Sequence, residues 1–194
     1  MPDPTYNENK VEFGLKNVHY AIGTPNGNGD YTYGTPKAWP GAVNLNMDPR
    51  GEQEVFRADD VDYFVVNGAG GYEGTLEMAR VIDQVRQDLL GDELIDGVLV
   101  EFDNKEAVVF ALLWEFDGDQ RARRHVMYGC TMTRPNLSGA TTGENNQKTP
   151  QTQTVNIKST AGPDHKAKAS TNAQTPAATY NGWYQSVFGK TATA

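Results

Sequence analysis

Hydrophobic and polar residues alternate along most of this chain, which is the pattern of β-strands with one buried face. On this basis strands are predicted over residues 11–22 (one strand with a break, or two), 41–47, 53–67, 72–80, 98–102, 107–116, 121–133, 152–159 and, with a weaker pattern, 165–171. The longest apolar run, residues 107–114, has the length of a strand and is far too short to span a membrane. We therefore expect a mainly β protein in which the strand at 107–116 is central and no segment inserts into a membrane.

One segment departs from the alternation and predicts a helix. Its apolar residues recur at three- and four-residue spacing, and they are Val81, Ile82, Val85, Leu89 and Leu90. Charged and polar residues fill the opposite face, and Gly91 stands where a glycine commonly ends a helix. The strand predicted over residues 72–80 is expected to run directly into this amphipathic helix of about ten residues, which covers one opening of a sheet pair.

Turn-forming residues connect two pairs of these strands into predicted hairpins. The sequence DGD at residues 117–119 is a tight-turn signal that precedes the strand at 121–133. The sequence DPRG at residues 48–51 is a second turn signal. Residues 41–67 are therefore expected to form a long hairpin with a charged outer part.

The remaining segments are polar or glycine-rich and are expected to surround the strands of a single domain over residues 1–194. Residues 1–10 are predicted to be a flexible N-terminal arm, residues 23–40 a glycine-rich loop and residues 138–153 a polar loop. Residues 176–190 are predicted to dock on the domain through a short helix whose aromatic and apolar face consists of Tyr180, Trp183, Tyr184, Val187 and Phe188.

Charge is distributed unevenly over the chain. The formal net charge is −8, with −12 on residues 1–133 and +4 on residues 134–194. An acidic body argues against a nucleic-acid reader, which needs a basic stripe, and the asymmetry either helps subunits meet or has no role.

The one cysteine, Cys130, lies in a strand pattern and is expected to be a small core residue of a protein from a reducing compartment. Residues 1–10 have no basic or apolar stretch, so no secretory signal is expected.

No pattern of residues carries catalytic, cofactor or metal chemistry. His19, His125 and His165 do not have metal-ligand spacing, and a single cysteine offers no ligand pair. The chain lacks the G-x-S-x-G motif of serine hydrolases. The segment around Lys190 resembles the end of a phosphate-binding loop, but Tyr184 replaces its first glycine. We therefore predict no catalytic residue, no cofactor-binding residue, no metal ligand and no enzyme activity.

The one basic cluster in the sequence consists of Arg121, Arg123, Arg124 and His125. On a strand, Arg121 and Arg123 share one face and Arg124 lies on the other. Two interpretations are open: the cluster binds a phosphate, or it makes ion pairs with acidic neighbours such as Glu115 and Asp117 across the hairpin. Aromatic residues are not interleaved with the cluster, so stacking of nucleic-acid bases is not expected.

Several segments, in order along the chain, resemble those of a known family. They are residues 13–18 (FGLKNV), 71–74 (GYEG) leading into the helix that ends at 89–91 (LLG), 110–116 (FALLWEF) with 118–119 (GD), 123–126 (RRHV), 134–135 (RP) and 183–184 (WY). On these residues the chain resembles, over residues 10–190, the major tail tube proteins of long-tailed (siphovirus-type) bacteriophages and related prophages.

The resemblance implies both a fold and an assembly. The fold would be a two-sheet β-sandwich or barrel with one flanking α-helix and a long protruding hairpin. Subunits would form hexameric rings that stack into a tube, and DNA would pass through the lumen during ejection into the host. The implied partners are further copies of the chain, the tail initiator or baseplate, the tape-measure protein and the tail terminator. The protein would be made in the bacterial host cytoplasm and located in the virion tail, and the family supplies no catalytic residues or cofactors.

The charge of the chain adds an expectation about DNA. Contact with phosphate groups needs clustered Lys and Arg facing the lumen, whereas the body of this chain is acidic. We therefore expect DNA to pass without tight binding along a lumen surface that is net negative. The basic C-terminal third is expected to lie at subunit contacts or outside the tube.

A different class of function is open besides the tail tube. This alternative is a monomeric lectin-like or adhesin-like β-sandwich module of a virion. In that case Tyr31, Tyr33 and Trp39 of the glycine-rich loop would be exposed and would stack on sugars. Rings or tubes would distinguish the first class from the monomers of the second.

Overall fold

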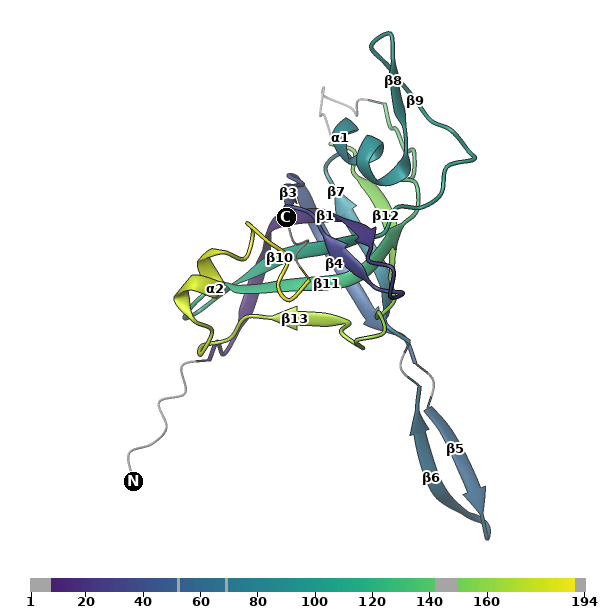
Figure 1. Cartoon of the computed structure of the whole chain (residues 1–194). Helices are drawn as coiled ribbons and strands as arrows, with labels where there is room; N and C mark the ends of the chain where they lie inside the picture. The colour runs from purple at the N-terminus through teal and green to yellow at the C-terminus, as the bar shows by residue number, and fades with distance from the viewer. Residues whose placement is uncertain (1–7, 52, 69, 142–149, 191–194) are drawn as a thin grey trace.

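Strands dominate the computed structural model, which describes residues 8–51, 53–68, 70–141 and 150–190 (Figure 1). The strands are β1 (Glu12–Pro25), β2 (Tyr31–Tyr33), β3 (Lys37–Ala38), β4 (Ala42–Pro49), β5 (Gln53–Ala58), β6 (Val61–Asn67), β7 (Tyr72–Met78), β8 (Glu93–Ile95), β9 (Val98–Val100), β10 (Phe110–Gly118), β11 (Arg123–Met132), β12 (Gln153–Ser159) and β13 (Lys168–Ser170). The helices are α1 (Asp83–Val85), its π-helical continuation η1 (Arg86–Leu90), and α2 (Ala177–Asn181). The expected mainly β fold with one flanking helix is confirmed.

Nine of the strands form one large antiparallel sheet. Its order is β2-β1-β10-β11-β12-β7-β4, with β3 added to β1 and β13 added to β11. The sheet ends at β2 and β4, which do not pair, so no closed barrel forms; β1 and β4 nevertheless pack on one core. β10 lies between β1 and β11, which confirms the central position expected from its apolar sequence.

Two hydrophobic cores lie on opposite faces of the central strands. In β10, Leu112 and Trp114 belong to the first core, while Ala111 and Leu113 belong to the second. Because both faces of β10 are buried, its sequence is a continuous apolar run rather than an alternation. The second core is covered by the segment that follows α2, which contributes Trp183 among others.

The helix predicted from the apolar stripe is present and buries the predicted face. Val85 and Leu89 are buried in the first core. Only Asp83–Val85 is α-helical, and Arg86–Leu90 continues as a π-helical turn. Gly91 ends it in the left-handed conformation (φ 74°), and its N–H donates to the carbonyl of Arg86.

The predicted strand at residues 11–22 is the longer strand β1, and it is a single strand with irregular pairing. Its register with β10 shifts between Phe13 and Leu15 and again between Lys16 and His19. Asn17, which lies in the second shift, has a positive φ of 50°. Of the two sequence interpretations, one strand with a break is therefore the correct one.

A protruding hairpin is confirmed, but the prediction that residues 41–67 pair with one another was wrong. β4 pairs instead with β7, so that Pro49 lies opposite Tyr72, and β5 pairs with β6. The chain continues outward past Pro49, and the turn lies at Asp59 and Asp60, which both have positive φ. The DPRG signal was misleading because Arg50 stays paired: its N–H donates to the carbonyl of Gly71 over 2.8 Å.

The remaining predictions concern the N-terminal arm, the polar loop, Cys130 and the weak strand pattern. The described residues begin at residue 8, so most of the predicted N-terminal arm lies outside them. Residues 142–149 of the polar loop also lie outside them. The described parts of that loop, 138–141 and 150–152, have no regular structure. Cys130 is buried in the first core, which confirms its predicted place. The weak strand pattern at 165–171 corresponds to the short strand β13.

Candidate assembly surfaces

The β5–β6 hairpin projects away from the sheet and exposes large apolar side chains (Figure 1). Tyr63 is 69% exposed and Phe64 is 62% exposed, and Val55 and Val61 are exposed as well. The register of the pair shifts here, because Phe64 lies opposite Phe56 and Asp62 opposite Arg57, so Tyr63 is an extra residue in β6. An isolated two-stranded hairpin is marginally stable in water, and apolar surface of this kind marks a contact surface.

The outer half of this hairpin is acidic. Asp59 and Asp60 form the exposed turn, and Asp62 follows in β6. Arg57 makes an ion pair of 3.1 Å with Asp62, which leaves the two turn aspartates without a partner of opposite charge among the described residues. The charged outer part predicted from the sequence is therefore found at the tip of β5–β6.

A second, smaller hairpin, β8–β9, projects from the opposite end of the molecule (Figure 1). Its side chains Leu94, Ile95 and Val98 are exposed. Asp96 and Gly97 form its turn, both with positive φ. The strand predicted over residues 98–102 contains β9, but its partner β8 was not predicted, although Asp-Gly between hydrophobic residues is a strong hairpin signal.

Ion pairs anchor the base of the β8–β9 hairpin to the helix. Arg86 contacts Asp92 over 2.6 Å and Glu101 over 2.9 Å, and Arg134 also contacts Glu101 over 2.8 Å. The carboxylate of Asp92 is buried, so this contact is shielded from solvent. The hairpin is thus held at its base while its apolar turn remains free of the fold.

Two strands leave backbone edges open at the ends of the large sheet. β4 pairs only with β7, and the first half of β1 pairs only with β10. Exposed apolar residues lie at these edges, among them Phe13 and Val43. Edges of this kind can pair with a strand of another chain.

The arginine cluster makes local ion pairs, as one of its two interpretations expected. Arg124 contacts Glu115 over 3.0 Å, and Arg123 contacts Glu12 over 3.3 Å. Arg121 lies over the Tyr180 ring, 3.3 Å from its centroid. The other acidic residue proposed as a partner, Asp117, pairs with Lys16 instead, so that part of the expectation was wrong.

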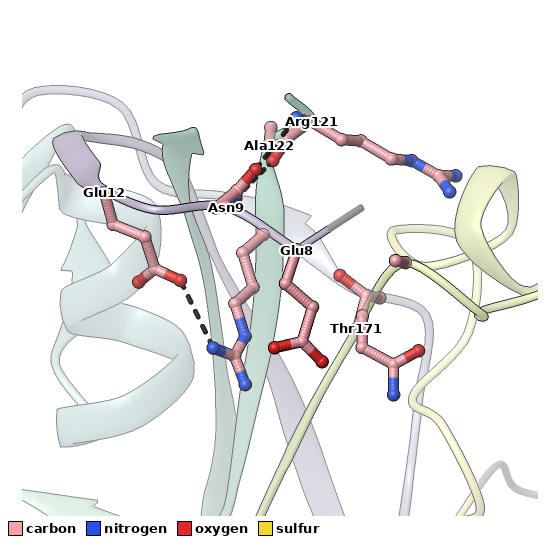
Figure 2. A pocket seen from close by; sticks show the side chains of 9 residues that line it. Glu8, Asn9, Glu12, Arg121, Ala122 and Thr171 are labelled. Carbon is pink, nitrogen blue, oxygen red and sulfur yellow. Dashed lines mark hydrogen bonds and ion pairs between the residues drawn. The ribbon is translucent and has the colours of Figure 1, made fainter. Parts of the chain in front are cut away.

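A small cavity of about 80 Å³ lies beside this cluster, lined by Glu8, Glu12 and Arg123 among others (Figure 2). The Asn9 side chain donates to the carbonyl of Arg121 over 2.7 Å and accepts from its N–H over 3.0 Å. These bonds hold the described start of the chain against the turn after β10. The cavity is much smaller than the ~300–1,000 Å³ of ligand pockets.

The residues expected to stack on sugars in the lectin-like alternative are mostly buried, so that expectation was wrong. Trp39 is 0% exposed and Tyr33 is 1% exposed, while Tyr31 is half-buried. The Tyr33 hydroxyl accepts a hydrogen bond of 2.8 Å from the N–H of Gly129. The glycine-rich loop therefore packs its aromatic residues into the fold.

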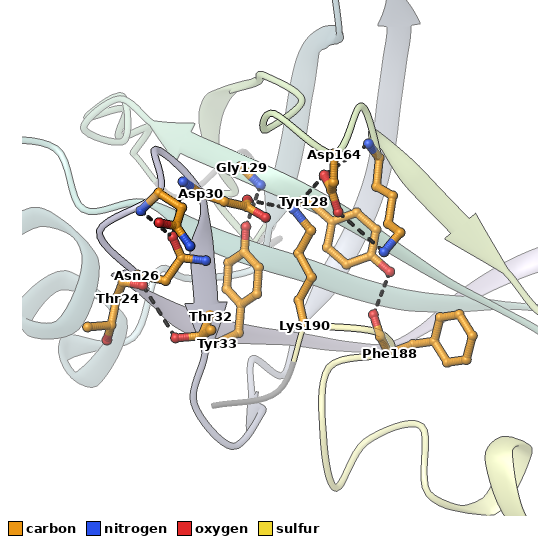
Figure 3. Close-up of polar contacts among 12 residues, drawn as sticks. Thr24, Asn26, Asp30, Thr32, Tyr33, Tyr128, Gly129, Asp164, Phe188 and Lys190 are labelled. Atoms are coloured by element: carbon orange, nitrogen blue, oxygen red, sulfur yellow. Dashed lines mark hydrogen bonds and ion pairs between the residues drawn. The ribbon is translucent and has the colours of Figure 1, made fainter. Parts of the chain in front are cut away.

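The C-terminal segment packs on the fold through Trp183 and Val187, and a buried lysine closes the contact (Figure 3). The prediction that a short helix carries this face was wrong, because α2 ends at Asn181 and Phe188 is exposed. The Lys190 ammonium lies 2.7 Å from Asp30 and 2.9 Å from Asp164. Burial lowers the pKa of Lys190, but the hydrogen bonds to the two carboxylates outweigh it, so this pKa is raised above its ordinary value. Tyr128 adds a hydrogen bond of 2.8 Å to the carbonyl of Phe188.

The described residues contain neither a metal-binding cluster nor a membrane-spanning helix. No group of three or more His, Cys, Asp and Glu residues there could hold a metal ion. No helix there is long and apolar enough to cross a membrane. The features that stand out in the described residues are projecting hairpins and open sheet edges.

Comparison with known proteins identifies the family. No curated protein matches the chain. Among solved structures, a chain of the anti-feeding prophage (AFP) baseplate, determined by cryo-EM and 6-fold symmetrised, is similar over 90% of this chain and 100% of that chain, with 10% sequence identity and a TM-score of 0.44. The family model described as phage tail tube protein matches residues 1–190. On that match, the chain belongs to the phage tail tube proteins, which are structural components of the virion tail and not enzymes.

Proposed function

We propose that this protein forms hexameric rings that stack head to tail into a tube, and that phage DNA passes through this tube on its way into the host. The observation that carries the proposal is the pair of projecting hairpins. Both hairpins expose large apolar side chains, and they extend from opposite ends of the subunit (Figure 1). Such surfaces are costly in a monomer and are suited to contacts between copies.

The arrangement of the two hairpins favours stacking over a closed dimer. A two-fold dimer uses the same patch on both subunits, whereas a head-to-tail contact joins two different patches and can repeat without end. The β5–β6 and β8–β9 hairpins are different patches at different ends. In the proposed tube, β5–β6 of one ring lies against the neighbouring ring.

Lateral contacts within a ring are assigned to the open edges of the large sheet. β4 and the first half of β1 have free backbone groups, with Phe13 and Val43 exposed beside them. Pairing these edges between neighbours satisfies the free groups and joins the sheets into a continuous wall. At the ends of the tube, the same surfaces would meet the tail initiator or baseplate and the tail terminator, while the tape-measure protein would occupy the lumen during assembly.

DNA is proposed to pass this wall without tight binding. Every arginine of the described residues except Arg121 has a carboxylate partner, and Arg121 lies over Tyr180. Tight phosphate contact needs free cationic groups, and repulsion from an acidic wall is screened beyond about 10 Å at 0.1 M salt. We expect no measurable duplex binding by the protein in a mobility-shift assay at near-physiological salt. Micromolar binding that falls steeply with salt would contradict this.

Electron microscopy tests the proposed assembly directly. Purified protein is concentrated, or mixed with a tail initiator complex, and imaged in negative stain alongside size-exclusion chromatography. The expected result is six-fold rings and tubes. Protein that stays monomeric at every concentration and with the initiator would overturn the proposal.

A further inference from the structure

A cavity of about 520 Å³ opens next to the base of the β5–β6 hairpin. Met47 and Tyr72 line it, and these residues lie at the ends of β4 and β7 from which the hairpin extends. Its floor is apolar and includes Trp114, Phe116 and Met127 of the central strands. The cavity is therefore the open mouth of the first core, on the side of the molecule that carries β5–β6.

Some polar atoms of the lining residues lie beneath the surface of this cavity. The Trp114 Nε1 atom and both ring nitrogens of His125 are buried and have no hydrogen-bond partner among the described residues. His125 is only 7% exposed, and its ring stacks on Trp114 with centroids 5.2 Å apart. Burial, with the charges of Arg123 and Lys168, lowers the pKa of His125 to about 4, so the neutral ring offers one N–H and one lone pair at neutral pH.

The rim of the cavity favours an anionic group. Arg123 stands there with its partners Glu12, at 3.3 Å, and the hydroxyl of Ser170, at 3.1 Å. Lys168 makes no ion pair with a described carboxylate and lies over the Tyr72 ring, 5.2 Å from its centroid. An occupant with apolar side chains and one carboxylate would match the apolar floor and the cationic rim.

The β8–β9 turn has this chemistry. It presents Leu94, Ile95 and Val98, all exposed, around Asp96 at the tip of the hairpin. The turn also lies at the end of the molecule opposite to β5–β6, so head-to-tail stacking brings it to the cavity side of the next copy (Figure 1). The subunit's own β5–β6 hairpin starts beside the cavity and leads away from it.

We propose that the β8–β9 turn of a second copy inserts into this cavity, with its apolar side chains on Met47 and Phe116 and the Asp96 carboxylate facing Lys168 and Arg123. This inference rests on the head-to-tail stacking proposed above and names the contact between successive rings. We call this cavity the socket, because it would hold the turn of a second copy.

A cysteine pair tests the contact. The variant Asp96→Cys with Lys168→Cys is assembled and oxidised, and the products are separated on a non-reducing gel; the native Cys130 is buried and does not compete. We expect a ladder of covalent multimers from assembled protein and monomers from each single variant. The matched control, Asp103→Cys with Lys168→Cys, places the first cysteine beyond β9 and should give no ladder.

The outcomes separate the two proposals. Tubes without a ladder from the Asp96 and Lys168 pair would overturn the socket while leaving the tube intact, whereas unmodified protein that forms no rings or tubes would overturn the stacking itself. If the double cysteine variant does not assemble, an exchange of the two charges tests the socket instead. Asp96→Lys should slow assembly by about tenfold or more through like-charge repulsion, and adding Lys168→Asp should restore most of the rate. A double variant that assembles no better than Asp96→Lys would also overturn the socket.

Discussion

The β10–β11 and β5–β6 hairpins are both antiparallel pairs with hydrophobic sequences, yet their surroundings are opposite. In β10, the residues from Phe110 to Trp114 are buried on both faces of the sheet. In β6, Tyr63 and Phe64 are exposed. The first hairpin obtains its apolar contacts from its own chain, and the second has to obtain them from another copy. The comparison separates the part of the sequence that folds the subunit from the part that assembles it.

Removing the exposed hairpin is expected to have the largest effect, and on assembly alone. Residues 53–67 are replaced by a short Gly-Ser linker, which keeps the β4–β7 pairing and removes the apolar contact surface. Microscopy should show no tubes, while the melting temperature of the monomer stays close to that of the unmodified protein. A matched control replaces only Arg57 and Asp62 by Ser, which removes an exposed ion pair of little energetic weight and should leave tubes intact. Normal tubes from the linker variant would contradict an assembly role for the hairpin.

A core substitution is expected to act in the opposite way, on the fold. Leu89 is 1% exposed and packs in the first core. Leu89→Ala should lower the free energy of unfolding by about 2–5 kcal/mol, because the lost side chain leaves a cavity. Urea unfolding of the monomer measures this. An unchanged midpoint would show that the helix stripe does not carry the core contacts assigned to it.

The smallest expected effect is a dependence of the free energy of unfolding on pH, and it arises from the buried His125. Burial, Arg123 and Lys168 lower the pKa of His125 from 6.5 to about 4. Between these values the unfolded chain binds the proton and the folded chain does not, so stability rises with pH in this window. Lowering the pH from 7 to 4 should therefore remove up to about 3 kcal/mol of stability through this group. The variant His125→Phe, compared with the unmodified protein at each pH, should lack this component, and identical pH profiles would contradict the assignment.

Sequence patterns predicted the self-contained part of the fold well, for physical reasons. The apolar run of β10 has no alternation because both of its faces are covered. The stripe with Val85 and Leu89 and the terminal Gly91 identified the helix, because helix periodicity and a left-handed cap are local properties. The aromatic spacing around Trp183 similarly predicted a docking segment, which the second core confirms.

The pairing of β4 to β7 and the burial of Trp39 could not be predicted in the same way. Strand partners are set by contacts between distant segments, and the turn at Asp59 and Asp60 is not a typical hairpin sequence. Trp39 lies in a glycine-rich loop that looks exposed until the first core closes around it. The socket gave no local signal, because its lining residues come from strands that are distant in the sequence, such as Met47 of β4, Trp114 of β10 and Lys168 of β13.

Hydrogen–deuterium exchange on monomers and on assembled tubes tests the central claim most directly, because it measures both hairpins in one experiment. Backbone amides of β10–β11 should be protected in both states, since their surroundings come from the subunit. Amides of β5–β6 should exchange rapidly in the monomer and become strongly protected in the tube. Equal exchange of β5–β6 in monomer and tube would contradict the claim that this hairpin is an assembly surface.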